Sequence, residues 1–541
     1  MSGKKKVLII GMDGFTWNVG RGLIDQGHMP NLAELIRRGC HGDLKSVIPY
    51  ETSPAWVSFQ TGCNPDKTSI FGFHRYDASA GKISLNSFAN ASVPSLWQLA
   101  DRNGKTVVSL NMPMSFPPPK VKGIIVPGLM CPRMSSKTVH PSNVYRKYIK
   151  PVENYNIVNT DRVDTLHDFV NAQIKTEKAR YQSAKKIMND IDWDIFSFQM
   201  QSTDYLQHEL WWTLDRDARG YSEEAYNEAI RLYIACDEII GELVNANPNA
   251  LTIVVSDHGF CRLKGLFQMN TWLEKNGYLK TIDSQSVPKT PFAAFKHQVK
   301  KRVPIVKSLA RLYGNILKTR KQSTEKDLPY CNAQLGYLQN LIDIENTKAF
   351  SLGALASMIH ITPEGNRQKD LAARITEGLL KDFGPASDQP VISRISSGKE
   401  LYGTEENVDA LPDLVVEFEK GYCNALYPLS DEMVGTPYYS NEFSENVQRG
   451  THERNGIMVI AGEGVKAGPL DAEIIDIAPT VLACMGLPVP KHIDGKVLTE
   501  AFDTPPQVTY EDIDIDTKGK AKYSEAEQAE IEKQLADLGY I

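Results

Sequence analysis

The sequence contains few cysteines, and none of them are paired at the spacing of a metal-binding motif. Eight cysteines are distributed over 541 residues, and no Cys-x-x-Cys pair occurs. This distribution excludes a disulfide framework and a structural zinc site of the finger type. We therefore predict reduced thiols that are mostly buried.

Long hydrophobic segments are also absent. No run approaches the roughly 18 apolar residues that a membrane-spanning helix needs. Behind the basic start at Lys4 to Lys6, the apolar run 7–10 is too short for the core of a signal peptide. The sequence therefore predicts a cytoplasmic protein without a transmembrane segment.

The chain has no strong excess of charge of either sign. Its formal net charge is −6, whereas a protein that binds nucleic acid non-specifically carries an excess of Lys and Arg. We therefore expect no nucleic-acid polymer as a partner. The composition leaves the oligomeric state open.

Short apolar runs alternate with amphipathic helical stretches along most of the chain. This alternation is typical of a mostly parallel sheet with helices on both faces, and it predicts an α/β fold. Helices are expected at 29–39, about 165–190 and about 222–246. Strands are expected at 7–10, 106–110, 195–198, 251–255 and 457–461.

Acidic side chains follow three of the expected strands. Asp13 comes after 7–10, Asp204 after 195–198, and Asp257 after 251–255. In open α/β sheets ligands bind at the carboxyl ends of the strands, where loops bring together residues that are distant in sequence. We therefore expect these carboxylates to meet at one edge of the sheet.

Two of the candidate ligands form a helical pair. Asp204 and His208 are four residues apart, so on a helix both side chains project from one face. Their oxygen and nitrogen donors suit zinc, and manganese or iron less selectively. Taken alone, such a pair is more often a surface or capping pair.

Three further candidates are Asp257, His258 and His452. Neighbouring residues of a strand point to opposite faces, so Asp257 and His258 can reach one cavity only where the strand has already turned. Gly259 is consistent with such a bend. His452 in isolation carries little information, because a lone histidine is usually a satisfied core or surface residue.

Asp13 and Thr52 each allow two interpretations. Asp13, between Gly11 and Gly14, is either a turn aspartate or a carboxylate whose small neighbours leave space for a metal. Thr52, before an expected helix at 55–59, is either an N-cap or a hydroxyl placed beside free amide N–H groups that favour a phosphate. A threonine hydroxyl becomes a nucleophile only when a metal or base removes its proton.

Asn111 follows the expected strand 106–110 and precedes Met112-Pro113. It is a candidate donor to a phosphate oxygen of the substrate. A turn asparagine before proline is the alternative that we favour.

In this order and spacing the residues resemble the signature of the alkaline phosphatase superfamily, and within it the type I phosphodiesterase/nucleotide pyrophosphatase family. The resemblance spans about residues 5 to 505. The matching segments are Ile10-Gly11-Met12-Asp13-Gly14, Pro49 to Trp56 with Thr61-Gly62, Asp204 with His208, Ser256-Asp257-His258-Gly259, Met269 to Leu273, Gly450-Thr451-His452, and Asp476 to Thr480.

The resemblance implies an alkaline-phosphatase-like α/β fold with an inserted cap, and a hydrolase that uses two divalent cations. Zn²⁺ is the expected metal, with Mn²⁺ or Fe as alternatives. Thr52 would attack phosphorus to give a phospho-threonine intermediate, and the substrate would be a small phosphodiester or pyrophosphate, nucleotides included. One cation would be held by Asp204, His208 and His452, and the other by Asp13, Asp257, His258 and the Thr52 oxygen.

The residues beside Thr52 depart from those of the eukaryotic nucleotide pyrophosphatases. Those proteins carry Lys-Thr-Phe-Pro-Asn-His, whereas this chain has Glu51-Thr52-Ser53-Pro54-Ala55-Trp56, which resembles a prokaryotic phosphohydrolase/phosphomutase branch. A nucleotide preference therefore does not follow. A phosphomonoesterase or phosphomutase acting on a phosphorylated small molecule is the alternative. A non-catalytic protein that binds nucleotides or lipid headgroups is a third reading, against which the complete set of seven residues argues.

The predicted domain organisation has three parts, of which the first is formed by two separate ranges. Residues 1–283 and 327–510 would form the catalytic core. Residues 284–326, rich in Lys and Arg, would be an inserted cap, either a solvated helix face or a basic cover over an anionic substrate. Residues 511–541 would be a linker and a short helix, opened by a capping box of Ser524 and Glu527.

Overall fold

The structure is a computed structural model of the whole chain. It describes residues 5–159, 163–281, 342–363, 370–403, 411–425, 432–440, 443–514 and 523–538. The predicted basic cap at 284–326 lies outside the described residues.

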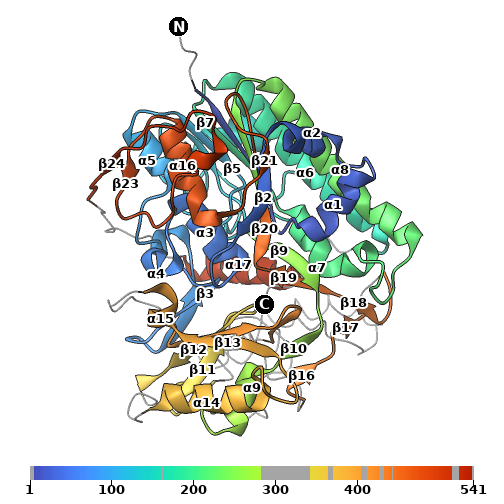
Figure 1. Cartoon of the computed structure of the whole chain (residues 1–541), viewed down its shortest axis with the longest axis vertical. Helices are drawn as coiled ribbons and strands as arrows, with labels where there is room; N and C mark the ends of the chain where they lie inside the picture. Colours follow the sequence, from blue (N-terminus) through green and yellow to red (C-terminus); the bar gives the residue numbers. More distant parts are fainter. Residues whose placement is uncertain are drawn as a thin grey trace, which may run out of the picture.

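A nine-stranded sheet forms the centre of the molecule (Figure 1). One of its strands, β20, pairs antiparallel with both neighbours, whereas the other pairings are parallel. The sheet is therefore mostly parallel, which confirms the predicted fold class. Its order is β21 (Gly468–Pro469), β2 (Cys40–Lys45), β20 (Asn455–Ala461), β8 (Leu251–Val255), β1 (Val7–Met12), β7 (Ile195–Met200), β5 (Val107–Leu110) and β6 (Gly123–Val126), with β22 (Ala472–Glu473) pairing to β2.

The two faces of this sheet are buried under different helices. Successive residues of a strand point to opposite faces, so Leu8 and Ile10 of β1 lie in one apolar cluster and Val7 and Ile9 in another. The first cluster includes residues of α1 (Trp17–Asp25), α2 (Pro30–Arg38), α6 (Leu166–Asp190), α7 (Ser202–Leu214) and α8 (Glu223–Ala246). The second includes residues of α3 (Thr52–Thr61), α5 (Leu96–Arg102) and α16 (Ile477–Cys484).

The strands and helices expected from periodicity are present. The predicted helices at 29–39, 165–190 and 222–246 are α2, α6 and α8, and each predicted strand belongs to the central sheet. Each strand of the five is buried on both faces along most of its length, which is why it reads as a continuous apolar run.

A second, smaller sheet lies apart from the first, at the bottom of Figure 1. All of its pairings are antiparallel, in the order β11 (Ala349–Leu352), β12 (Ser357–Ile361), β14 (Leu414–Phe418) and β13 (Ile392–Ser397). Helix α14 (Leu371–Phe383) packs on it through four apolar side chains and shares its hydrophobic cluster. The sequence analysis did not single out this sheet. We call it the small lobe.

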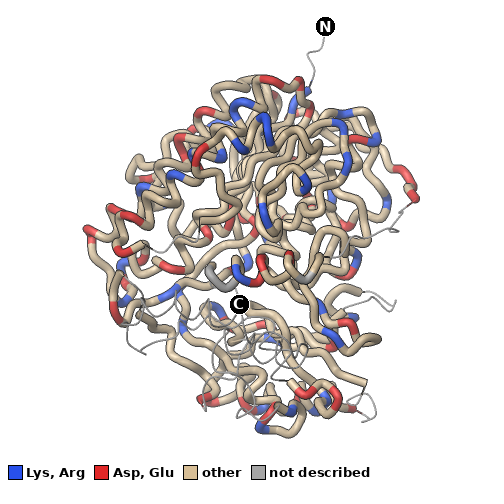
Figure 2. Tube along the Cα trace, turned by 180° about the vertical axis from the view of Figure 1, so that it is seen from behind, with Lys and Arg blue, Asp and Glu red and all other residues tan. Residues whose placement is uncertain are grey.

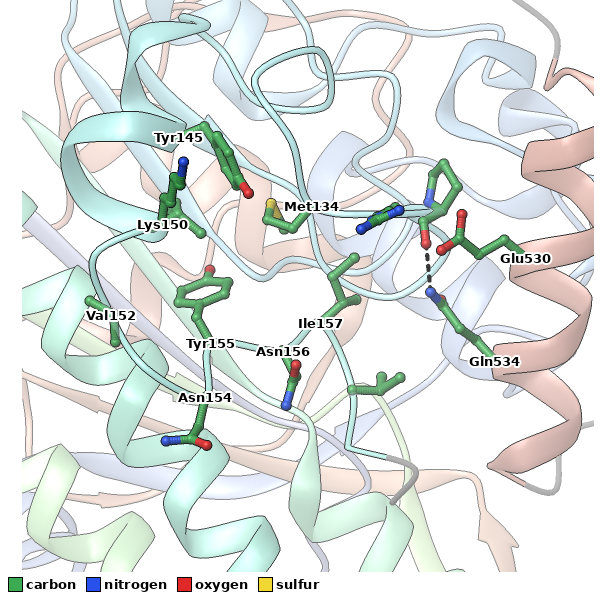
Figure 3. Close-up of a pocket in the computed structure, with 14 residues that line it drawn as sticks. Met134, Tyr145, Lys150, Val152, Asn154, Tyr155, Asn156, Ile157, Glu530 and Gln534 are labelled. Carbon is green, nitrogen blue, oxygen red and sulfur yellow. Dashed lines mark hydrogen bonds between the residues drawn. The ribbon is translucent and has the colours of Figure 1, made fainter. Parts of the chain in front are cut away.

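The C-terminal helix α17 (Glu525–Asp537) is held against the segment that follows β6. Its predicted capping box is present, because Ser524 and Glu527 exchange hydrogen bonds. Tyr523 donates its hydroxyl to the carbonyl of Met130, and Gln534 donates to that of Pro132. Between α17 and residues 132–158 lies a polar cavity of about 400 Å³, drawn in Figure 3.

Charged residues of both signs are interspersed along the chain in the view of Figure 2. Within the described ranges, no helix is both long enough and apolar enough to cross a bilayer.

Candidate active site

Six of the seven predicted site residues lie around one buried cluster at the carboxyl edge of the central sheet, and the seventh, Thr52, adjoins it. Asp13 directly follows β1, and Asp257 follows β8. Asp204 and His208 lie on α7, which begins two residues after β7. His452 comes from β19 (Gly450–Glu453), which pairs antiparallel with β9 (Gly259–Arg262).

Asp204, His208 and His452 offer ligand atoms that all lie within 4.8 Å of one another. The Asp204 Oδ1 atom is 3.6 Å from His208 Nε2 and 3.4 Å from His452 Nε2. The two Nε2 atoms are 2.8 Å apart. This is the first of the two ligand sets that the resemblance implies.

Around His258 lies a second group. Its Nε2 atom is 3.7 Å from Asp13 Oδ1, 3.2 Å from Asp257 Oδ2 and 3.4 Å from Thr52 Oγ1. The resemblance implies that these four residues form one ligand set, and the structure brings them together.

Asp204 lies between the two groups. Its Oδ1 atom is also 3.9 Å from His258 Nε2, and Asp13, Asp204 and His258 form a second trio of ligand atoms within 4.8 Å. The sequence analysis placed Asp204 in one set, whereas the geometry makes it available to both.

The tautomers of two histidines are fixed by backbone carbonyls. His452 Nδ1 is 3.2 Å from the carbonyl oxygen of Tyr50, and His258 Nδ1 is 3.2 Å from that of Gly259. A carbonyl oxygen only accepts, so each Nδ1 carries the proton. Each Nε2 therefore presents a lone pair toward the cluster, as a metal ligand must.

The orientation of Asp13 is set by two residues that the sequence analysis gave no role. Trp56 Nε1 and Gln199 Nε2 donate to Asp13 Oδ2 at 2.7 and 2.8 Å. The other oxygen, Oδ1, faces His258. The other carboxylate of this group, Asp257, accepts at Oδ1 from the amide of Gly14 at 3.1 Å. The only sequence signal for Trp56 was its place in the motif that contains Thr52.

Burial governs the electrostatics of this cluster. Burial, followed by the charges of Asp257 and Asp204, raises the pKa of Asp13 well above its ordinary value. Burial likewise raises the pKa of Asp257. The same cause lowers the pKa of His208 and of His452 to about 3 and that of His258 well below its ordinary value, so all three imidazoles are neutral at pH 7.

This donor set fits divalent cations. Asp13 Oδ1 and Asp257 Oδ2 are buried, and neither has a hydrogen-bond partner among the described residues. Buried carboxylate oxygens are ordinarily paired or coordinate metals. Three carboxylates and three neutral imidazoles supply the oxygen and nitrogen ligands that zinc prefers and that manganese and iron accept.

Thr52 is the first residue of α3, and Glu51 is its N-cap. The N–H groups of Thr52 and Ser53 have no acceptor within the helix, and with the helix dipole they favour an anion beside the Thr52 hydroxyl. All ten residues of α3 are buried, so the packed helix holds this hydroxyl in a fixed place.

Asn111 has its side chain engaged within the protein. Tyr155, which lines the cavity of Figure 3, donates its hydroxyl to Asn111 Oδ1 at 2.6 Å. Asn111 Nδ2 is 3.5 Å from the carbonyl oxygen of Gln199, and the backbone φ of Asn111 is +61°. These contacts agree with the turn interpretation of Asn111.

Comparison with known proteins assigns the chain to a protein family. The model of the family described as type I phosphodiesterase/nucleotide pyrophosphatase matches residues 7–436. The chain belongs to this family. As a member of the type I phosphodiesterase family it has the fold of the alkaline phosphatase superfamily and is a phosphoester hydrolase.

Solved structures resemble this phosphodiesterase-family chain over most of its length. Phosphonoacetate hydrolase from Sinorhizobium meliloti 1021, in complex with phosphonoacetate, has a TM-score of 0.54 at 13% identity, covering 89% of this chain and 96% of that chain. Its complex with phosphonoformate gives 0.53 at 14% identity over the same shares. Human ectonucleotide pyrophosphatase/phosphodiesterase 5 gives 0.49 at 12% identity, covering 92% and 99%. None of the curated proteins matches the chain by sequence.

Proposed function

We propose that this protein hydrolyses phosphodiester or pyrophosphate bonds of a small molecule through a phospho-threonine intermediate on Thr52. The single observation that supports this most directly is the position of the Thr52 hydroxyl. It lies 3.4 Å from His258 Nε2, at the edge of a buried cluster of carboxylates and neutral imidazoles. The first turn of α3 adds free N–H groups on the same side.

Two divalent cations would be held here, one by Asp204, His208 and His452 and the other by Asp13, Asp257, His258 and Thr52. When bound, they would neutralise charge on the phosphoryl group and favour the deprotonated Thr52 hydroxyl. Zn²⁺ is our first choice, with Mn²⁺ or Fe as alternatives. The shared position of Asp204 Oδ1 suits a site in which two cations lie close together.

The reaction then divides into two displacements at phosphorus. Thr52 Oγ1, whose proton passes to solvent, attacks phosphorus; the bond from phosphorus to the leaving oxygen breaks, that oxygen takes a proton from solvent, and a phospho-threonine is left. A water molecule then attacks the same phosphorus and releases a proton, and the bond to Thr52 Oγ1 breaks as that oxygen regains its proton. Two inversions give net retention of configuration. His452 and His258 keep their Nδ1 protons, which are hydrogen-bonded to backbone carbonyls, so their Nε2 atoms remain directed at the site.

A substrate panel combined with two threonine variants tests this proposal. We expect the purified protein to contain two divalent metal ions and to hydrolyse bis-(4-nitrophenyl) phosphate faster than 4-nitrophenyl phosphate. Thr52→Ala should lower kcat at least about 10³-fold and keep the metal content. Thr61→Ala removes a buried hydroxyl from the other end of the same helix, where it donates to the Val57 carbonyl, and should keep kcat.

Two results would count against the proposal. Preference for the monoester would show that the substrate is a phosphomonoester and that the protein is a phosphomonoesterase. Full turnover by Thr52→Ala would remove the phospho-threonine. Phosphonoacetate belongs in the panel because the phosphonoacetate hydrolase shares the fold.

A further inference from the structure

A buried carboxylate from a neighbouring helix caps the start of the helix that carries two proposed metal ligands. Helix α7 contains Asp204 and His208, and its N-cap residue is Gln201. The first N–H groups of a helix have no partner within the helix, so another group must accept from them. At α7 that acceptor is Glu177, which lies 24 positions earlier in the sequence, on α6.

One oxygen of Glu177 receives four donors. The backbone amides of Gln201 and Ser202 donate to Oε1 at 3.0 and 2.9 Å, and the Ser202 hydroxyl donates at 2.7 Å. The fourth donor is Arg180 Nη1, at 3.0 Å. A negative charge at a helix N-terminus is also favoured by the helix dipole. Glu177 therefore fixes the point at which α7 begins.

Arg180, which forms an ion pair with Glu177, is itself hydrogen-bonded to a neighbouring loop. Glu177 and Arg180 have side chains that are 0% and 1% exposed. Arg180 Nε donates to the carbonyl of Asn156 at 2.9 Å, and Asn156 belongs to the loop that lines the cavity of Figure 3. This buried pair therefore connects the loop, α6 and α7.

The metal cluster depends on where α7 begins. Asp204 is two residues beyond Ser202, and Thr203 donates its hydroxyl to the carbonyl of Asp13 at 2.6 Å. A shift of the first turn would therefore move Asp204 Oδ1 relative to both ligand groups. Partners behind metal ligands typically contribute 10- to 100-fold to metal affinity or activity. The geometry points to Glu177 as the positioning residue that sets the affinity of this site for its divalent cations, an inference that rests on the proposed function.

Titration of the chelator-stripped protein with Zn²⁺ tests this assignment. Glu177→Gln keeps the size of the side chain but removes the charge that Arg180 and the α7 amides share. We expect its Kd for Zn²⁺ to rise at least tenfold. The Zn²⁺ concentration needed for half-maximal hydrolysis of bis-(4-nitrophenyl) phosphate should rise by a similar factor, and kcat at saturating Zn²⁺ should recover most of its value.

Asp237 provides a matched control. It is a buried carboxylate on α8 that caps α2 in the same manner, since it accepts from the amides of Asn31 and Leu32 at 3.0 and 2.8 Å. None of the proposed ligands lies on α2. Asp237→Asn should lower the Tm by an amount comparable to Glu177→Gln and leave the Kd for Zn²⁺ within about twofold of the wild type.

The outcomes separate this inference from the proposed function. If the wild type binds Zn²⁺ and Glu177→Gln binds it equally tightly, or if Asp237→Asn weakens binding as much, the positioning role is wrong. If the wild type itself neither binds divalent metal nor hydrolyses a phosphoester, the proposed function is wrong. Should Glu177→Gln fail to fold, Ser202→Ala removes one donor of the same cap, and an unchanged Kd for Zn²⁺ in that variant would overturn the assignment.

Discussion

The imidazole of His258 lies flat against that of His452, with ring centroids 3.6 Å apart and planes inclined by 18°. His258 follows β8, and His452 lies on β19, so the contact joins segments almost 200 positions apart. Two protonated rings could not stack in this way, because like charges would repel. The stack therefore fits the lowered pKa values of both rings and links the two proposed ligand groups.

Replacing His452 should disable one ligand group and disturb the other. His452→Asn removes the Nε2 ligand atom that lies 3.4 Å from Asp204 Oδ1, and it removes the ring that stacks on His258. We expect the metal content to fall from two ions per chain toward one, and kcat/KM to fall by about 100-fold or more. Metal analysis of the purified protein measures the first quantity. The surface residue His167, replaced by Asn, should change neither; a two-ion content in His452→Asn would contradict the assignment.

Trp56→Phe should weaken catalysis through Asp13. The change removes the Nε1 donor that is 2.7 Å from Asp13 Oδ2 and leaves Gln199 as the side-chain donor to that oxygen among the described residues. We expect the metal concentration for half-maximal activity to rise by about tenfold. The Tm should fall modestly, since a hydrogen bond to a charged group contributes about 1.5–3 kcal/mol.

Trp97 offers the control for this change. It is also fully buried, and its Nε1 donates at 2.9 Å to Gln60 Oε1, which is not one of the proposed metal ligands. Trp97→Phe should lower the Tm without changing the metal requirement. If both variants change the requirement alike, the effect comes from packing rather than from the orientation of Asp13.

Much of this arrangement could be predicted from the sequence because it follows local rules. A strand that is buried on both faces is a short apolar run, and the polar residue after its last position lies at the carboxyl edge of a parallel sheet. Asp13 and Asp257 were found on that basis. Their partners across the site came from the motif order of the family, because His452 on its own has no local pattern.

Other features depend on contacts that the sequence does not encode locally. The cap that Glu177 provides joins α6 to α7 at a spacing with no periodic signal, and within α6 Glu177 reads as an ordinary helical glutamate. Strand β20 reads like its neighbours, since antiparallel pairing leaves the same buried apolar run. The shared position of Asp204 depends on the angle at which α7 leaves the sheet, and the side-chain spacing gives no information about that angle.

Glu51→Ala should uncouple the nucleophile helix from the small lobe. Glu51 Oε1 accepts from the amides of Ala354 and Leu355, at 3.1 and 3.2 Å, in the loop between β11 and β12. The variant leaves the buried amide of Leu355 and the partly buried amide of Ala354 without this acceptor, and an unpaired buried group costs about 1–3 kcal/mol. We expect a lower Tm and a several-fold lower kcat, because Thr52 is the next residue. Glu51→Gln retains an acceptor oxygen and should lose less of both; equal losses in the two variants would contradict this account.

Acidification should destabilise the fold through two buried histidines outside the metal site. Burial lowers the pKa of His74 and of His360 to about 4 from an ordinary value of 6.5. His74 lies on β3 (His74–Asp77), and His360 lies on β12, where its ring contacts those of Tyr76 and Phe350. Between pH 6.5 and 4 the unfolded chain binds protons at these positions that the folded chain does not. Stability therefore falls as the pH falls through this window, by about 3 kcal/mol per residue at its lower end.

The double variant His74→Gln and His360→Gln isolates this effect, because glutamine does not titrate. We expect the variant to have a lower Tm than the wild type at pH 8 but a shallower decrease of Tm between pH 6.5 and 4. Thermal unfolding followed by circular dichroism at half-unit pH intervals measures both curves. His167→Gln, at an exposed position, should reproduce the wild-type slope. Parallel curves for the double variant and the wild type would show that these two rings do not control the acid sensitivity, and would direct attention to other groups, such as His208 and His452, whose pKa burial also lowers.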